Sequence, residues 1–88
     1  MADYTHLPRH PARARIQGFS TDRDRLWVLH TPDCVAGFTE YNDEVTGCDP
    51  RLATLYPDEF HYGSNAYYIL WTLAPERGWR VEHVEDRW

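Results

Sequence analysis

The densest concentration of aromatic and branched apolar residues in the chain lies in residues 65–84, which read NAYYILWTLAPERGWRVEHV. Such residues suit a pleated, half-buried surface, so residues 66–73 are predicted to form a strand. Pro75 and Gly78 then favour a tight turn, because proline presets φ and glycine supplies a positive φ. Residues 79–84 alternate large apolar with polar side chains, which is typical of a strand with one solvated face. The sequence therefore predicts a long C-terminal β-hairpin that carries most of the core.

A second hairpin is predicted nearer the N-terminus. Residues 15–20 alternate in polarity, residues 26–31 begin with the β-rich run Leu-Trp-Val-Leu, and a polar turn of Asp and Arg side chains lies between them. The preceding residues contain prolines, histidines and arginines with little that could pack. We expect a flexible N-terminal arm over residues 1–14, followed by a single domain over residues 15–88.

Two helix-start signals lie between the predicted hairpins. Residues 31–33, Thr-Pro-Asp, offer an N-cap, a proline for the first turn and an acid beside it, and apolar side chains follow at helical spacing over residues 35–45. A strand over residues 35–41 is the alternative, because this segment holds a glycine and β-branched residues. Residues 49–57 repeat the start signal with Asp-Pro and predict a second, short helix. The predicted fold is a small two-layer α+β domain, with an antiparallel sheet of about four strands in two hairpins and two short helices on one face.

The charge and composition narrow the classes of partner. The chain has 88 residues, of which 42% are hydrophobic and 15% aromatic, enough for a small core. Its net charge of −5 argues against binding to nucleic acid or to an anionic membrane, since both require a positive surface. All nine basic residues are arginine, whose planar guanidinium can pair carboxylates and stack on rings. The sequence shows neither a signal peptide nor an apolar run near 20 residues, so we expect a cytoplasmic protein with free thiols and no membrane partner.

Four residues, His30, Cys34, Cys48 and His61, contain the side-chain types of a structural zinc site. Their spacing lacks the paired cysteines or histidines of known zinc motifs, so no metal and no cofactor are predicted. Cys48 precedes the Asp-Pro helix start, where a helix N-terminus could lower its pKa, but no catalytic signature surrounds either cysteine. A small metal-binding or thiol-dependent enzyme domain that uses these four residues is the alternative function.

The chain has more aromatic residues than a small core needs. One sheet face is expected to pack on the helices, and the other would then expose Tyr, Trp and Arg, the residue types that dominate binding hot spots. The alternative is that large aromatic side chains simply shield both faces of a thin sheet. The binding residues predicted on this basis are Tyr62, Tyr67, Tyr68, Trp71, Arg77, Trp79 and Arg80.

Two resemblances bear on function. Trp71, Pro75, Gly78 and Trp79 are similar to the tryptophan and P-x-G-W elements of MbtH-like proteins, the small partners of peptide synthetases, but the tryptophan-to-proline spacing is shorter here and we assign no family. In general character, the short, acidic, lysine-free chain resembles accessory proteins of phages and mobile elements, including inhibitors of host systems. We therefore predict a non-enzymatic protein-binding module, an inhibitor or adaptor of phage type that acts on a host protein through an aromatic sheet face. Homodimerisation through the same face is compatible with this hypothesis.

Overall fold

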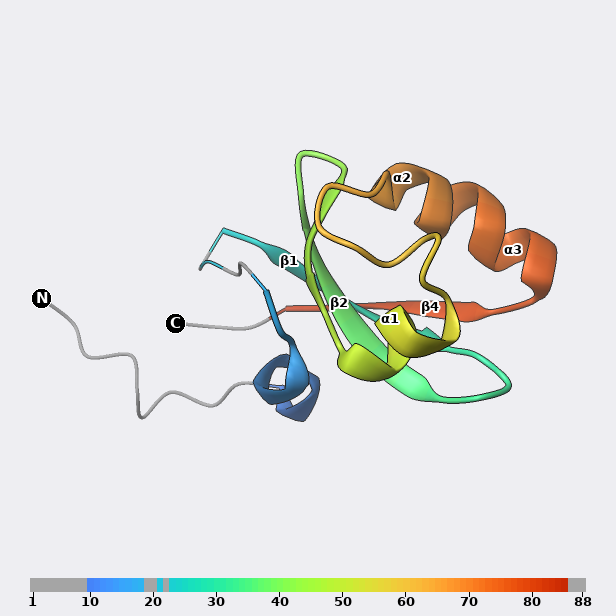
Figure 1. The fold of residues 1–88 in the computed structure, drawn as a ribbon, viewed down its shortest axis with the longest axis horizontal. Helices are drawn as coiled ribbons and strands as arrows, with labels where there is room; N and C mark the ends of the chain where they lie inside the picture. Colours follow the sequence, from blue (N-terminus) through green and yellow to red (C-terminus); the bar gives the residue numbers. More distant parts are fainter. Residues whose placement is uncertain (1–9, 19–20, 22, 86–88) are drawn as a thin grey trace, which may run out of the picture.

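A four-stranded antiparallel sheet with the strand order β3-β2-β1-β4 organises the fold (Figure 1). The computed structural model describes residues 10–18, 21 and 23–85. Three strands form a meander of two hairpins, and a fourth returns to pair with the first. Their bounds are β1 Arg25–His30, β2 Val35–Tyr41, β3 Glu44–Cys48 and β4 Arg80–Val84. The predicted α+β class, with four antiparallel strands and short helices, is confirmed.

Helix α1 (Pro50–Leu55) follows β3 directly. Asp49 is its N-cap, and the Asp49 carboxylate accepts a hydrogen bond from the backbone N–H of Arg51 at 2.9 Å. Pro50 occupies the first helical position, where its missing N–H costs nothing. The predicted Asp-Pro helix start is therefore confirmed.

A second, longer helical segment connects α1 to β4 and runs as one continuous coil beside the sheet (Figure 1). Its middle turns are π-helical, with hydrogen bonds that span one residue more than those of an α-helix. Gly78, at a φ of 72°, caps its C-terminus. The parts of this segment are α2 Ala66–Tyr68, the π-helical η2 Ile69–Leu73 and α3 Ala74–Arg77.

The core lies between the sheet and these helices. Leu29, Ala36 and Phe38 point from the sheet into a buried cluster that includes Leu52 of α1 and Phe60 of the following loop. The rings of Phe38 and Phe60 meet edge to face, with centroids 5.5 Å apart. The helical segment adds Ala66, Ile69, Leu70, Leu73 and Ala74, and Trp79 closes the cluster.

The 3₁₀ helix η1 (Pro11–Arg15) packs on the opposite face of the sheet, over β2. A side chain at Gly47 of β3 would place its Cβ 2.8 Å from Cγ2 of Ile16, so glycine is needed for this close approach. The next residue, Gln17, forms an isolated antiparallel bridge with Cys48.

Residues 1–9 lie outside the described residues, so the flexible arm over residues 1–14 stays a prediction.

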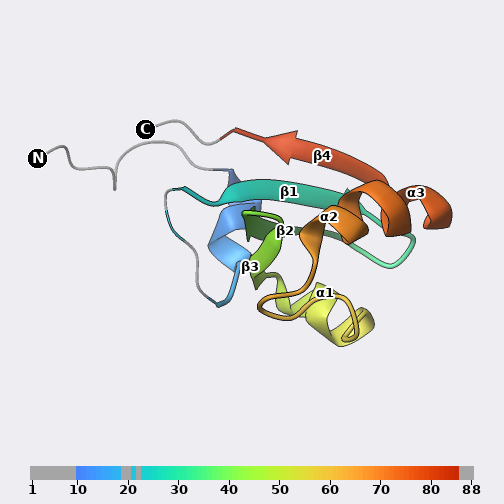
Figure 2. The same ribbon diagram turned by 90° about the horizontal axis from the view of Figure 1, so that it is seen from above.

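The outer edge of β3 is closed by the chain itself. The Val45 N–H donates to the Ser64 carbonyl and the Gly63 N–H donates to the Val45 carbonyl, both at 2.8 Å. Cys48 exchanges two hydrogen bonds with Gln17, at 2.9 and 3.0 Å. At the other margin of the sheet, β4 lies next to β1 (Figure 2).

The predicted strand over residues 66–73 is wrong, because this segment is helical. Its buried residues, Ala66, Ile69, Leu70, Leu73 and Ala74, recur at helical spacing and form one apolar stripe. Packing of this stripe on the sheet outweighs the β-propensity of the aromatic residues. Consequently β4 is not half of a C-terminal hairpin, and Gly78 uses its positive φ to cap a helix.

The predicted helix after residues 31–33 is also wrong, and the alternative strand is correct. Thr31 begins the turn between β1 and β2, where its hydroxyl accepts hydrogen bonds from the N–H groups of Asp33 and Cys34. The same hydroxyl would accept in a helix cap, which explains the false signal. The strand predicted over residues 15–20 is not formed in the part that is described, because η1 extends to Arg15 and residues 19–20 lie outside it. The hairpin partner of β1 is therefore β2.

Candidate functional site

Four side chains from three elements form a contiguous cluster that we call the aromatic patch: Trp27, Tyr67, Trp71 and His83. The Trp27 ring meets Trp71 edge to face at a centroid distance of 6.0 Å and lies 4.7 Å from the His83 ring. Tyr67 contacts Trp71 at 6.4 Å. Tyr67 and Trp71 are 57% and 55% exposed although both make ring contacts.

The secondary structure positions these rings. Trp27 of β1 and His83 of β4 are direct cross-strand partners, so they lie on one face of the sheet, the face that also carries Leu29. Tyr67 and Trp71 are four residues apart on the helical segment and therefore project from one side of it. The side of the helix that carries the aromatic patch is thus turned toward the β1–β4 part of the sheet.

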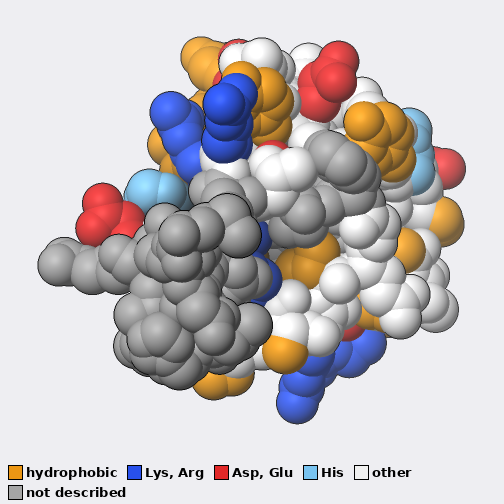
Figure 3. All heavy atoms as spheres, turned by 90° about the vertical axis from the view of Figure 1, so that its left-hand side faces the viewer, with side chains coloured by type: hydrophobic (Ala, Val, Ile, Leu, Met, Phe, Trp, Pro, Cys, Tyr) orange, Lys and Arg blue, Asp and Glu red, His pale blue; other side chains and the backbone are white. Residues whose placement is uncertain are grey.

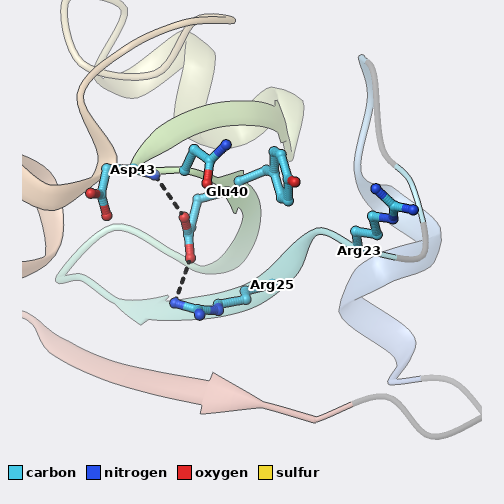
Figure 4. Close-up of a pocket in the computed structure, with 6 residues that line it drawn as sticks. Arg23, Arg25, Glu40 and Asp43 are labelled. Atoms are coloured by element: carbon cyan, nitrogen blue, oxygen red, sulfur yellow. Dashed lines mark hydrogen bonds and ion pairs between the residues drawn. The ribbon is translucent and has the colours of Figure 1, made fainter.

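A buried carboxylate anchors the patch. Glu40 is buried, and its Oε1 accepts a hydrogen bond from Nε1 of Trp27 at 3.3 Å. The guanidinium of Arg25 lies 3.6 Å from the same oxygen, and the Asp43 N–H donates to Oε2 at 3.2 Å (Figure 4). These groups border a polar hollow of about 270 Å³, whose lining also includes Arg23, Tyr41 and Asn42. Because the carboxylate already holds three partners, this arrangement fixes Trp27 and does not resemble a free catalytic acid or base.

The seven predicted binding residues do not form one site. Tyr67 and Trp71 belong to the aromatic patch. Tyr62 is exposed on the loop before the helical segment, and Tyr68 lies beside a separate hollow that Asp58 and His61 also line. The four exposed aromatic residues of this predicted set are therefore on the helical segment and its loop and not on a strand, while Tyr41 at the end of β2 is an exposed aromatic residue outside the set.

The remaining three predicted residues have structural contacts. Trp79 is only 7% exposed and belongs to the core. Arg77 covers the Trp79 ring at 5.1 Å and pairs with Glu59 at 3.3 Å. Arg80 lies on the opposite face of the sheet, where its guanidinium is 3.1 Å from the His30 ring.

Sequence reasoning missed Trp27 and His83. Trp27 lies within a short apolar run, where it reads as an ordinary strand residue, and His83 gave no signal by itself. Only the register of β1 against β4 brings these two residues together. The alternation of residues 79–84 identified the strand correctly but could not identify its neighbour.

The four residues of the alternative function are not brought together. Within the described residues, no group of three or more His, Cys, Asp or Glu side chains could hold a metal ion. Cys34 and Cys48 are free thiols. Burial, and then the charge of Asp49, raise the pKa of the Cys48 thiol, whereas a helix N-terminus could have lowered it. The arrangement therefore does not support a reactive thiolate at Cys48.

Figure 3 shows arginine and hydrophobic side chains adjoining on the end of the molecule that lies at the left in Figure 1. Comparisons with protein-family models, with curated proteins and with solved structures found no match. Among the described residues, no helix has the length and hydropathy needed to span a membrane.

Proposed function

We propose that this chain is a small non-enzymatic protein-binding module that docks on a partner protein through the aromatic patch. The observation that carries the proposal is the state of Tyr67 and Trp71, which are more than half exposed although Trp71 packs on Trp27 and Tyr67 packs on Trp71. Aromatic side chains that are fixed before binding lose little conformational entropy when a partner covers them. Such residues are typical anchors of protein interfaces.

Two further features support this role. Trp27, which lies beneath Trp71, is held by a hydrogen bond to the buried Glu40 carboxylate, so the support of the patch is itself fixed. Trp71 also lies within the π-helical turns, and such irregular turns occur frequently at functional sites. Together they describe a surface that is rigid and apolar at its centre, with Arg25 at its margin.

Within this proposal, the partner is a host protein, and the chain acts as an inhibitor or adaptor of phage type by occupying a surface of that protein. The acidic net charge and the small size suit a module that works by occlusion. Within the described residues no group of three or more His, Cys, Asp or Glu side chains could hold a metal ion, and burial raises the pKa of the Cys48 thiol, so no observation favours the metal-binding or thiol-dependent alternative.

Photo-crosslinking followed by binding to the purified partner tests the proposal. A photoreactive phenylalanine replaces Trp71 in one variant and Tyr62, which is 67% exposed but outside the patch, in a control variant. We expect a partner crosslinked from position 71 and not from position 62. With that partner purified, Trp71→Ala should weaken binding by about 2 kcal/mol, or roughly 30-fold, and Tyr62→Ala should leave the affinity nearly unchanged. Folded Trp71→Ala and Tyr67→Ala variants that bind as tightly as the parent chain would overturn the proposal.

A further inference from the structure

The outer edge of β4 has no strand partner among the described residues. Among the described residues, β4 is the last strand of the sheet, and the isolated bridges both involve the β3 side of the molecule. An edge strand of this kind is a template for pairing with another strand. The contrast with β3, whose edge is closed by Gln17, Gly63 and Ser64, makes β4 the side at which the sheet can be extended.

The hydrogen-bond pattern shows which groups of β4 point outward. The Thr31 N–H donates to the Cys34 carbonyl, which sets the alternation of hydrogen-bonded pairs between β1 and β2. By that alternation Val28 and its partner Gly37 do not bond to each other, and the Gly37 carbonyl indeed accepts from Asp49 on the far side. The backbone groups of Val28 therefore point toward β4.

The same alternation continues into β4. Because Val28 is the partner of Glu82, Glu82 bonds inward to β1, as do Arg80 and Val84. The N–H and C=O groups of Val81 and His83 then point outward, away from the sheet. A strand that pairs with β4 must therefore hydrogen-bond to Val81 and His83.

We propose that two copies of the chain pair antiparallel through their β4 edges and form a continuous eight-stranded sheet. A two-fold axis perpendicular to the sheet keeps the two faces matched, so only residues on the same face can oppose each other. With Val81 opposite Val81 of the second copy, each Arg80 lies opposite a Glu82. These are non-hydrogen-bonded positions, where side chains approach most closely, so two cross-strand ion pairs form.

The neighbouring register is disfavoured by charge. A shift that places Glu82 at the axis sets Glu82 opposite Glu82 and leaves Arg80 opposite Val84. Like charges directly opposite one another are destabilising. Arg80 and Glu82 are both exposed, and both reach the same His30 ring, at 3.1 and 3.3 Å, so their side chains already lie over the same region of the sheet. The charge pattern of β4 is thus complementary to itself, which favours a second copy over any other occupant of this edge.

The oligomeric state of charge-reversed variants tests the proposal. We expect the full chain to form a concentration-dependent dimer in sedimentation velocity. Arg80→Glu and Glu82→Arg should each weaken the dimer at least tenfold, and the double variant, which exchanges the two charges, should restore it. Circular dichroism should show that all three variants are folded. A parent chain that remains monomeric up to about 1 mM, or single variants that dimerise like the parent, would overturn the proposal.

Cysteine crosslinking tests the register separately. Val81→Cys places two thiols at the predicted axis, where the Cα atoms of a hydrogen-bonded pair lie about 5.5 Å apart, within the range of a disulfide. Glu82→Cys places two thiols opposite each other only in the shifted register. The parent chain serves as the control for any crosslinking through Cys34 and Cys48. Crosslinked dimer from position 81 supports the proposal. Crosslinking from position 82 alone contradicts the register, and crosslinking from neither position contradicts pairing through this edge. Of the aromatic patch only the His83 backbone lies at this edge, and the Trp71 side chain takes no part in these contacts, so Trp71→Ala should dimerise like the parent.

Discussion

The indole N–H of Trp27 donates a hydrogen bond to the buried Glu40 carboxylate over 3.3 Å, and this contact joins the aromatic patch to the β2–β3 end of the sheet. Glu40→Ala leaves the indole N–H without its acceptor and removes the partner of the Asp43 N–H. We expect a loss of about 1–3 kcal/mol in the free energy of unfolding, measured by urea denaturation. Glu40→Gln retains an acceptor for Trp27 and should lose less. Equal stability of Glu40→Ala and the parent chain would contradict this account.

Replacement by alanine should change the free energy of unfolding much more at Trp79 than at Trp71. Trp79 is part of the core, so Trp79→Ala should lower the free energy of unfolding by about 3–5 kcal/mol. Trp71 is largely exposed, and Trp71→Ala should cost about 1 kcal/mol or less. Urea denaturation of both variants provides the comparison. A Trp71→Ala variant as unstable as Trp79→Ala would show that the patch is core and not a surface for binding.

The cap of α1 should make stability depend on pH. Hydrogen bonds from the Arg51 side chain, at 2.8 and 3.1 Å, lower the pKa of the Asp49 carboxyl. A lowered pKa in the folded state stabilises the fold above the unfolded value of about 3.9, and this stabilisation is lost as the pH falls through the folded value. We expect Asp49→Ala to cost about 1 kcal/mol at neutral pH. The difference in stability between the parent and Asp49→Asn, which caps without titrating, should shrink on acidification, and a difference independent of pH would contradict the assignment.

Substitutions at Gly78 test how the helical segment is capped at its C-terminus. Its φ of 72° lies in the left-handed region, and a Cβ built there meets nothing within 4 Å, so a substitution is penalised by backbone conformation alone. Gly78→Ala should lower the free energy of unfolding by about 1–2 kcal/mol. Asn tolerates this conformation, so Gly78→Asn should cost less. Thermal or urea unfolding should show that Gly78→Ala is less stable than Gly78→Asn. The reverse order would show that contacts, and not backbone conformation, determine the loss of stability.

The raised pKa of Cys48 should make its thiol slow to react. In a Cys34→Ser variant, alkylation of Cys48 by iodoacetamide near pH 8 should be slower than that of a free cysteine, because less thiolate is present and the sulfur is partly buried. Addition of urea should restore the rate of an unfolded thiol. Mass spectrometry of the time course provides the measurement. Alkylation at the rate of a free cysteine, or faster, would reopen the thiol-dependent alternative.

The fold class could be predicted from the sequence because the strand signals of β1 and β4 and the helix cap at Asp49 agreed with the final packing, although the similar signal at Thr31 belongs to a turn. β1, β4 and the Asp49 cap of α1 are all local features, and each is where its local sequence indicates. The helix over residues 66–77 was misread because aromatic density was weighed more heavily than spacing. The spacing of Ala66, Ile69 and Leu73, together with Asn65 at the N-cap, carries the helical signal.

The sequence indicated that exposed aromatic residues would form the candidate site, but it did not identify all the residues that come together there. Tyr67 and Trp71 were identified as surplus aromatics, and they are indeed exposed. Trp27 and His83 join them through strand pairing over 56 positions of the chain, from 27 to 83, which no local pattern reports. Trp79 was expected on the surface and is in the core, because its backbone follows the Gly78 cap and turns the ring under Arg77.

The closure of the β3 edge by Gly63 and Ser64 has a consequence for solubility. A sheet that accepts strands at both margins can be extended without limit by further copies, as in a fibril. In the described part of this chain the β3 margin is already hydrogen-bonded to Gln17, Gly63 and Ser64, so in the proposed dimer, which joins at β4, neither outer margin accepts a further strand. In the proposed dimer the short loop around Gly63 blocks the addition of further strands, and we expect substitutions that loosen it to yield insoluble, cross-β material.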